Sequence, residues 1–199
     1  MVRDRREQLL DTAVRLFYRE GCHTVGIDRL LAEAGVAKMT LYKHFKSKDG
    51  LVLAAAERMR DQHLAAMRDY VDRHGGSARE KLLALFDFVA EWAAGEGFRG
   101  CPFQRLAVEH PDPAHPAHQA AARYKADQFR FILRLACEAG VPGPERFTRR
   151  FLMLIDGAVA LAQITGDLSP LQTARESAEA LLADSLAAAA PVLAGAVAH

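Results

Sequence analysis

Hydrophobic residues recur every three or four positions along most of this chain, and no stretch alternates with the period of a β-strand. The first stripe predicts a helix over about residues 4–20 and consists of Leu9, Leu10, Ala13, Leu16 and Phe17. Later stripes are separated by glycine and proline, so we predict an all-α fold of about nine helices. The stripe from Gly50 to about residue 73 has no glycine or proline inside, which predicts one long helix.

Two short helices follow the first one. The earlier helix has helically spaced Ile27, Leu30, Leu31 and Ala34, and Gly35 ends it. In the later helix Leu41 and Phe45 point inward together, which leaves on other faces Lys38, Thr40, Tyr42, Lys43 and His44. Two short helices joined by a tight glycine turn predict a helix-turn-helix motif.

Several residues are placed to cap helices. Thr24 is positioned to cap the second helix and Ser47 the fourth. Ser77 and Glu80 match a capping box, as do Ser169 and Gln172 around Pro170. Ala37, in contrast, gives the third helix no side-chain cap.

Positive charge is concentrated near the third helix. Residues 36–48 contain four lysines and no acid, although the formal net charge of the 199-residue chain is only +1. This local excess favours a polyanionic partner, while the alternative is an ordinary solvated face on a small helical hairpin.

The run from Phe17 to Leu51, with TLYKHFKSK at residues 40–48, resembles the DNA-binding region of TetR-type transcriptional regulators. The resemblance implies a three-helix DNA-binding domain over residues 1–47 and a larger helical ligand-binding and dimerisation domain over residues 48–199. Ala37 stands where this family usually has serine, and Met39 stands where a smaller residue is common.

The resemblance also implies how the chain contacts double-stranded DNA. Lys38 and Met39 are expected at base edges, and the residues expected mostly at phosphates are Thr24, Thr40, Tyr42, Lys43, His44 and Lys48. The partner would be a palindromic operator bound by a homodimer.

The last two helices are predicted from Pro144 to Thr165 and from Ser169 onward. They carry more apolar surface than one edge of a small domain needs, and Gly157, Ala158 and Ala162 permit close helix approach. We therefore expect a symmetric four-helix dimer interface, as the family uses. A core-facing role for the same stripes is the alternative.

Aromatic residues of the second domain are candidates to line a pocket for a small, largely apolar effector of unknown identity. They are Phe86, Trp92, Phe98, Phe103 and Phe129. Polar contacts would come from Gln104, Glu109, His110 and Asp156. The alternative is that most of these aromatics are simply core. The segments GCPF at residues 100–103 and EHPDP at residues 109–113 resemble one branch of TetR-type regulatory domains.

Other chemistry finds little support in the sequence. Cys101, His110, His115 and His118 match no metal-ligand spacing, so we assign no metal site and no cofactor. There is no G-x-S-x-G motif, and we expect no enzymatic activity. Cys101 lies near Arg99 and Arg105, so redox or electrophile sensing through its thiol remains an alternative, beside a plain buried thiol.

Three widely spaced cysteines favour a reducing compartment, and the charged N-terminus does not resemble a secretory signal. No apolar run approaches the roughly 20 residues that span a bilayer. We therefore expect a cytoplasmic, ligand-responsive regulator, most simply a repressor. The alternatives are a DNA-binding regulator without a small-molecule ligand and a helical enzyme.

Overall fold

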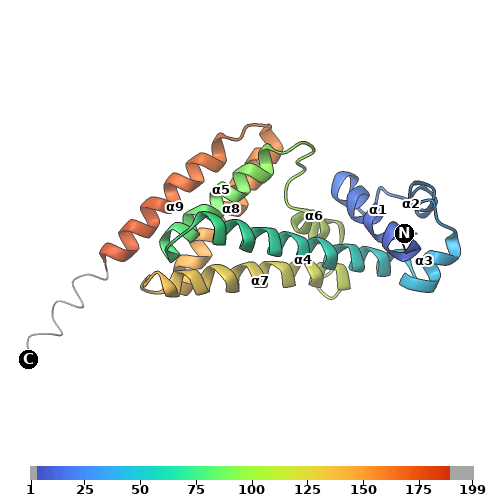
Figure 1. The fold of residues 1–199 in the computed structure, drawn as a ribbon, viewed down its shortest axis with the longest axis horizontal. Helices are drawn as coiled ribbons and strands as arrows, with labels where there is room; N and C mark the ends of the chain where they lie inside the picture. Colours follow the sequence, from blue (N-terminus) through green and yellow to red (C-terminus); the bar gives the residue numbers. More distant parts are fainter. Residues whose placement is uncertain (1–3, 189–199) are drawn as a thin grey trace, which may run out of the picture. The chain divides into compact units, whose positions relative to one another are not determined.

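A computed structural model describes residues 4–188 of the chain, and this part is built from α-helices without a β-strand. The all-α prediction with about nine helices is confirmed for these residues (Figure 1). The helices are α1 (Arg5–Glu20), α2 (Ile27–Ala34), α3 (Lys38–Phe45), α4 (Lys48–His74), α5 (Ala78–Ala94), α6 (Pro102–Glu109), α7 (Pro116–Glu138), α8 (Pro144–Thr165) and α9 (Ser169–Ala187).

The helices form two compact units. The first comprises residues 4–64 and 101–125, and the second comprises residues 65–100 and 126–188. The long helices α4 and α7 therefore contribute residues to both units, and α6 belongs with α1, α2 and α3. The domain boundary after residue 47 stays a prediction based on family resemblance.

In the first unit α1 packs against α2 and α3. All five residues of the predicted α1 stripe are buried, because they share one face of the helix. In α2 only Leu30 and Leu31 are fully buried, while Ile27 and Ala34 are half-buried. Leu41 and Phe45 of α3 point inward as predicted.

Most ends of these helices lie where the sequence predicted them. Gly35 ends α2 in the left-handed conformation, with φ 64°, and Ser47 Oγ accepts the Gly50 N–H at 3.0 Å. Ala37 precedes α3 without a side-chain cap, as predicted. The prediction for Thr24 is wrong, because α2 begins at Ile27 and its N-cap is Gly26, which has no side chain to accept a hydrogen bond.

The second unit is built around mutual packing of α5, α8 and α9. The Ser77 and Glu80 capping box at the start of α5 is confirmed. The predicted cap at Ser169 is wrong: α9 already includes this residue, and its hydroxyl donates to Asp167 while Gln172 contacts Glu176.

None of the described helices is both long enough and apolar enough to cross a membrane.

Candidate nucleic-acid interface

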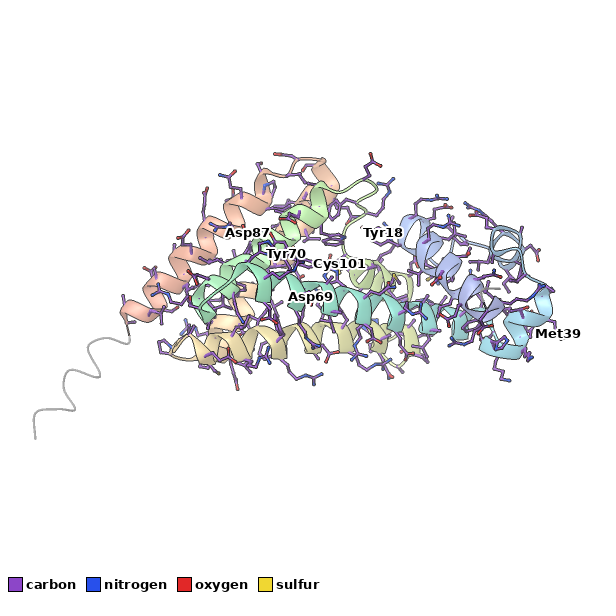
Figure 2. All side chains as sticks on the ribbon, in the orientation of Figure 1. Tyr18, Met39, Asp69, Tyr70, Asp87 and Cys101 are labelled. Carbon is purple, nitrogen blue, oxygen red and sulfur yellow. The ribbon has the colours of Figure 1, made fainter. Side chains whose placement is uncertain are left out.

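The outer face of α3 exposes the side chains that the sequence assigned to DNA. The exposed ones are Lys38, Met39, Tyr42, Lys43 and His44. Met39 is 75% exposed and lies at the outer edge of α3 (Figure 2). Thr24 is exposed in the segment before α2, and Lys48 is half-buried at the start of α4.

Thr40 departs from the expected outward placement. Its side chain is only 9% exposed and lies on the inner side of α3 with Leu41 and Phe45. Thr40 therefore has less surface to offer a phosphate than its neighbours, and its assignment as a DNA contact stays a prediction.

Two acidic side chains of the first unit, Glu20 on α1 and Glu33 on α2, are paired with arginines. Arg29 donates to Glu20 at 2.9 Å and to Glu33 at 2.9 Å, and Arg15 also donates to Glu33 at 2.9 Å. The hydrogen bond from Arg29, and then that from Arg19, lowers the pKa of Glu20 to about 2. These carboxylates are therefore ionised at neutral pH, and their charge is balanced locally.

The lysines near α3 have no such balance. In the part of the chain that the structure describes, no ion pair involves Lys38, Lys43, Lys46 or Lys48. Lys46 Nζ only donates a long hydrogen bond, 3.5 Å, to the Lys43 carbonyl. Within the described residues, the exposed surface around α3 thus carries positive charge that no ion pair balances, which suits a surface that binds phosphates.

Arg58 of α4 holds α1 in place beneath this surface. Its guanidinium donates to Glu7 at 2.7 Å and to Asp11 at 3.2 Å. The hydrogen bond from Arg58 lowers the pKa of Glu7. Because both acids lie on α1, this contact fixes α1 relative to the first turns of α4 and so positions the helix-turn-helix.

The segment after α1 is also fixed, by the end of α6. Glu109 accepts hydrogen bonds from the Cys22 backbone N–H at 2.9 Å and from the Cys22 thiol at 2.5 Å, and Arg105 donates to the Tyr18 carbonyl at 3.1 Å. Gly21 permits this approach, because its φ is +89° and an added Cβ would lie 2.1 Å from Glu109 Oε1. Burial, followed by the hydrogen bond to Glu109, raises the pKa of Cys22 to about 12.

His110 completes this cluster and is 8% exposed. Its Nε2 lies 3.3 Å from Cys22 Sγ, its ring stacks on His115 at a centroid distance of 4.3 Å, and its carbonyl contacts His118 Nδ1 at 2.8 Å. Burial, and then the neighbouring His115 and His23, lower the pKa of His110. The sequence singled out Glu109 and His110 but not Cys22, because these residues are some 87 positions apart and no local pattern joins them.

The remaining residues predicted to line a ligand pocket occur mainly as aromatic pairs. In the first unit Phe103 stacks on Tyr124 at 3.8 Å, and Gln104 is half-buried. In the second unit Phe86 packs against Phe151 at 5.0 Å and Trp92 against Phe98 at 5.0 Å. Phe129 lies beneath the Arg149 guanidinium, and Asp156 is half-buried. A pocket shared by the whole set stays a prediction.

Cys101 carries a thiol, is 8% exposed and occupies the N-cap position of α6 (Figure 2). Its burial agrees with the plainer of the two interpretations made from the sequence. A sensing role for this thiol stays untested.

An apolar surface of a different kind lies on α8 and α9. Large hydrophobic side chains there are exposed: Met153 by 72%, Leu161 by 52%, Ile164 by 80% and Leu168 by 40%. Met153, Gly157 and Leu161 are four residues apart on α8, and with Pro170, Thr173 and Ser177 of α9 they line a shallow groove. We refer to this surface as the α8–α9 face.

Comparison with known proteins agrees with the geometry of the first unit. Residues 9–55, which cover most of α1, all of α2 and α3 and the start of α4, match the family model for bacterial regulatory proteins of the tetR family. The chain is 22% identical to the HTH-type transcriptional regulator YjdC of Escherichia coli K12 over 177 residues, 89% of this chain and 93% of YjdC. It is 36% identical to the HTH-type transcriptional activator FasR of Mycolicibacterium smegmatis over 126 residues, 61% of this chain and 52% of FasR.

Similarity extends to the whole fold. The crystal structure of SCO4454, a TetR-family transcriptional regulator from Streptomyces coelicolor, matches with a TM-score of 0.86 and 34% identity. The match covers 91% of this chain and 89% of SCO4454, so it includes both the helix-turn-helix and the C-terminal helices. This similarity, together with the family match over residues 9–55, shows that the chain is a DNA-binding, non-enzymatic transcriptional regulator and belongs to the TetR family.

Proposed function

We propose that this regulator binds a palindromic operator as a homodimer, represses transcription there, and is released by a small, largely apolar effector. The observation that carries the proposal is the exposed outer face of α3, where lysines that pair with no acid among residues 4–188 lie beside the exposed Met39. On a helix of eight residues, such a surface suits insertion into a major groove.

The contacts divide by chemistry. Lys38 and Met39, at the start of α3, would meet base edges, since the first residues of a recognition helix usually do. Tyr42, Lys43 and His44, together with Thr24 and Lys48, would contact mainly phosphates. The thioether of Met39 offers an apolar contact of the kind that a thymine methyl group accepts.

Dimerisation is proposed through the α8–α9 face. A surface with several large exposed hydrophobic side chains is costly to leave in water. Gly157 supports close approach of a second helix, because an added Cβ there would meet nothing within 4 Å in the same protomer. A two-fold axis through this face would present two α3 helices to major grooves about 34 Å apart.

Release by an effector is proposed to act through the spacing of the two α3 helices. An effector bound among the aromatic side chains of the second domain would favour a spacing that no longer fits the operator. The long helix α4 supports this route, because it begins directly after the helix-turn-helix and runs for 27 residues without interruption.

The operator proposal is tested by selecting duplexes from a random pool with the full-length protein. We expect a palindrome whose half-sites lie about one helical turn apart. Replacing Met39 with alanine should change the preferred base at one position of each half-site, whereas replacing Lys43 with alanine should weaken all sequences alike. No enrichment of any duplex would contradict the proposal.

The sign of regulation needs a separate experiment, since one relative, FasR, is named an activator. A reporter gene placed behind the selected operator should be more active without this protein than with it. Lower activity without the protein would establish activation and reject repression. A thermal-shift screen of apolar compounds, followed by operator release, then tests the effector.

A further inference from the structure

Four side chains able to bind a metal converge where the end of α1 meets the end of α6. Cys22 and His23 belong to the segment before α2, and Glu109 and His110 lie at the end of α6. One ligand atom each from Cys22, His23 and His110 lies within 4.8 Å of the other two. These groups come from two chain segments far apart in sequence, and all belong to the first compact unit.

We propose that Cys22, His23, Glu109 and His110 form a binding site for a divalent, borderline-soft transition-metal ion of the zinc class. Thiolate sulfur, imidazole nitrogen and carboxylate oxygen are the ligand atoms that such ions take in proteins, usually in a tetrahedral arrangement. In a tetrahedral zinc site, sulfur and nitrogen ligands lie about 3.5 Å apart. The distance from Cys22 Sγ to His110 Nε2 is 3.3 Å, so this pair is already close to that geometry.

Glu109 and His23 have to move to reach the same ion. Glu109 Oε2 lies 2.5 Å from Cys22 Sγ, and an entering ion would separate the two atoms. His23 is exposed and forms an edge contact with the His110 ring at a centroid distance of 4.8 Å, so its imidazole is free to turn toward the ion. Stacking on His115 fixes the plane of the His110 ring in advance.

The charges of the site also balance. A Cys22 thiolate and the Glu109 carboxylate together neutralise a divalent cation, which lowers the cost of holding it in a partly buried place. Imidazole ligates a metal in its neutral form, so His110 would bind the ion as the neutral ring. The nearby charged groups on α4 are Lys48, which acts on Cys22, and Asp49, which acts on His110.

Binding would replace the S–H bond of Cys22 by a sulfur–metal bond and release that proton to solvent, with no change of oxidation state. The Cys22 thiol donates a hydrogen bond to Glu109 before the ion arrives, so it carries its proton until then. One proton should therefore leave for each ion bound at neutral pH. The bound ion would join the segment before α2 to α6 and stabilise the contact that Glu109 already makes.

The test uses full-length protein that has been treated with a chelator under reducing conditions. Titration with Co²⁺, which takes the place of Zn²⁺, should give a thiolate charge-transfer band that saturates at one ion per chain. Zn²⁺ should abolish this band, raise the unfolding temperature and release one proton per chain. A protein that shows no thiolate band and no proton release would overturn the proposal.

Matched variants identify the ligands. Cys22→Ser should lose the thiolate band, while Cys137→Ser should keep it, because Cys137 is exposed and lies on α7. His23→Ala removes an exposed side chain, so the fold should persist while Zn²⁺ affinity falls at least tenfold. Circular dichroism of each metal-free variant checks folding. Loss of the band in Cys137→Ser, or unchanged Zn²⁺ affinity in His23→Ala, would contradict the assignment.

Discussion

The outer face of α3 and the α8–α9 face are both uncovered in the protomer, but their chemistry is opposite. The α3 face carries lysines with no ion pair within the described residues, and its exposed apolar side chains are Met39 and Tyr42. The α8–α9 face carries Met153, Leu161 and Ile164 around a helical glycine. Exposure to water costs the charged α3 face little free energy, whereas it is unfavourable for the apolar α8–α9 face.

This difference separates two kinds of binding. Solvated lysines remain exposed at little cost in free energy, so the α3 face is stable without a partner. It can bind a polyanion reversibly and in a salt-dependent way. Removing exposed leucine, isoleucine and methionine from water lowers the free energy of the system. The α8–α9 face therefore favours lasting association with another apolar surface. Salt should therefore affect DNA binding strongly and dimerisation weakly.

The largest expected effect comes from placing a charge on the α8–α9 face. Gly157→Glu should leave the protomer folded, since the added side chain meets open space there. In a dimer the same carboxylate would be buried without a partner, a cost of about 3 kcal/mol or more, which is a dimer Kd at least about 100-fold higher. Analytical ultracentrifugation measures this change.

Lys81→Ala is the matched control for that experiment, because it alters a half-buried residue of the same unit that lies on α5, outside the α8–α9 face, and pairs with Asp72. The control should sediment as the unaltered protein does. Equal dimerisation of Gly157→Glu and the unaltered chain would show that the α8–α9 face is not the dimer interface. The conclusion that this apolar face serves lasting association would then be wrong.

A pH titration tests the first unit through the half-buried His63 of α4. Burial, and then Lys125, lowers the pKa of His63 to about 4 from its ordinary 6.5. The unfolded chain therefore binds the proton more readily than the folded chain. The contribution of His63 to the free energy of unfolding is complete above pH 6.5 and falls by about 3 kcal/mol as the pH drops to 4. Below pH 4 this residue makes no further difference.

His63→Gln should therefore show a flatter dependence of unfolding free energy on pH between 6.5 and 4, measured by urea denaturation. His44→Gln, which changes an exposed side chain of α3, serves as the control and should keep the original slope. A slope unchanged in His63→Gln would mean that this histidine is protonated alike in the folded and unfolded chain.

A smaller effect is expected on the charged face. Lys43→Ala should weaken operator binding by about tenfold at low salt and reduce the slope of log K against log salt by about one. Lys81→Ala, which removes a lysine from the second unit, should change neither quantity. Should both variants lose affinity equally, net charge and not the α3 face would govern binding.

The smallest effect concerns stability alone. Ser77→Ala removes the side-chain half of the capping box at the start of α5 and should cost about 1 kcal/mol of unfolding free energy. Operator affinity should stay the same when the protein is kept well below its unfolding temperature. Weaker operator binding in this variant would show that the second unit influences the α3 face even without an effector.

The sequence by itself determined the helices and much of their inward faces. The three- and four-residue spacing of a stripe places its members on one face of a helix. All members of the first stripe are buried in α1: Leu9, Leu10, Ala13, Leu16 and Phe17. Gly35 ends α2 and Ser77 caps α5 through contacts with the nearby backbone. The turn after α2 and the start of α5 could therefore also be predicted from the sequence. The lysines of α3 could be placed outward because Leu41 and Phe45 fix the inner side.

Only the tertiary structure decided which distant groups meet. Thr24 and Ser169 resembled caps, but cap positions depend on where the first hydrogen-bonded turn begins, and here the N-caps lie two residues and one residue away. Thr40 turned out to be buried because neighbouring helices cover that side of α3. The meeting of Cys22 with Glu109 and His110 joins positions about 87 residues apart, and no local periodicity records a contact that arises when α6 packs against the end of α1.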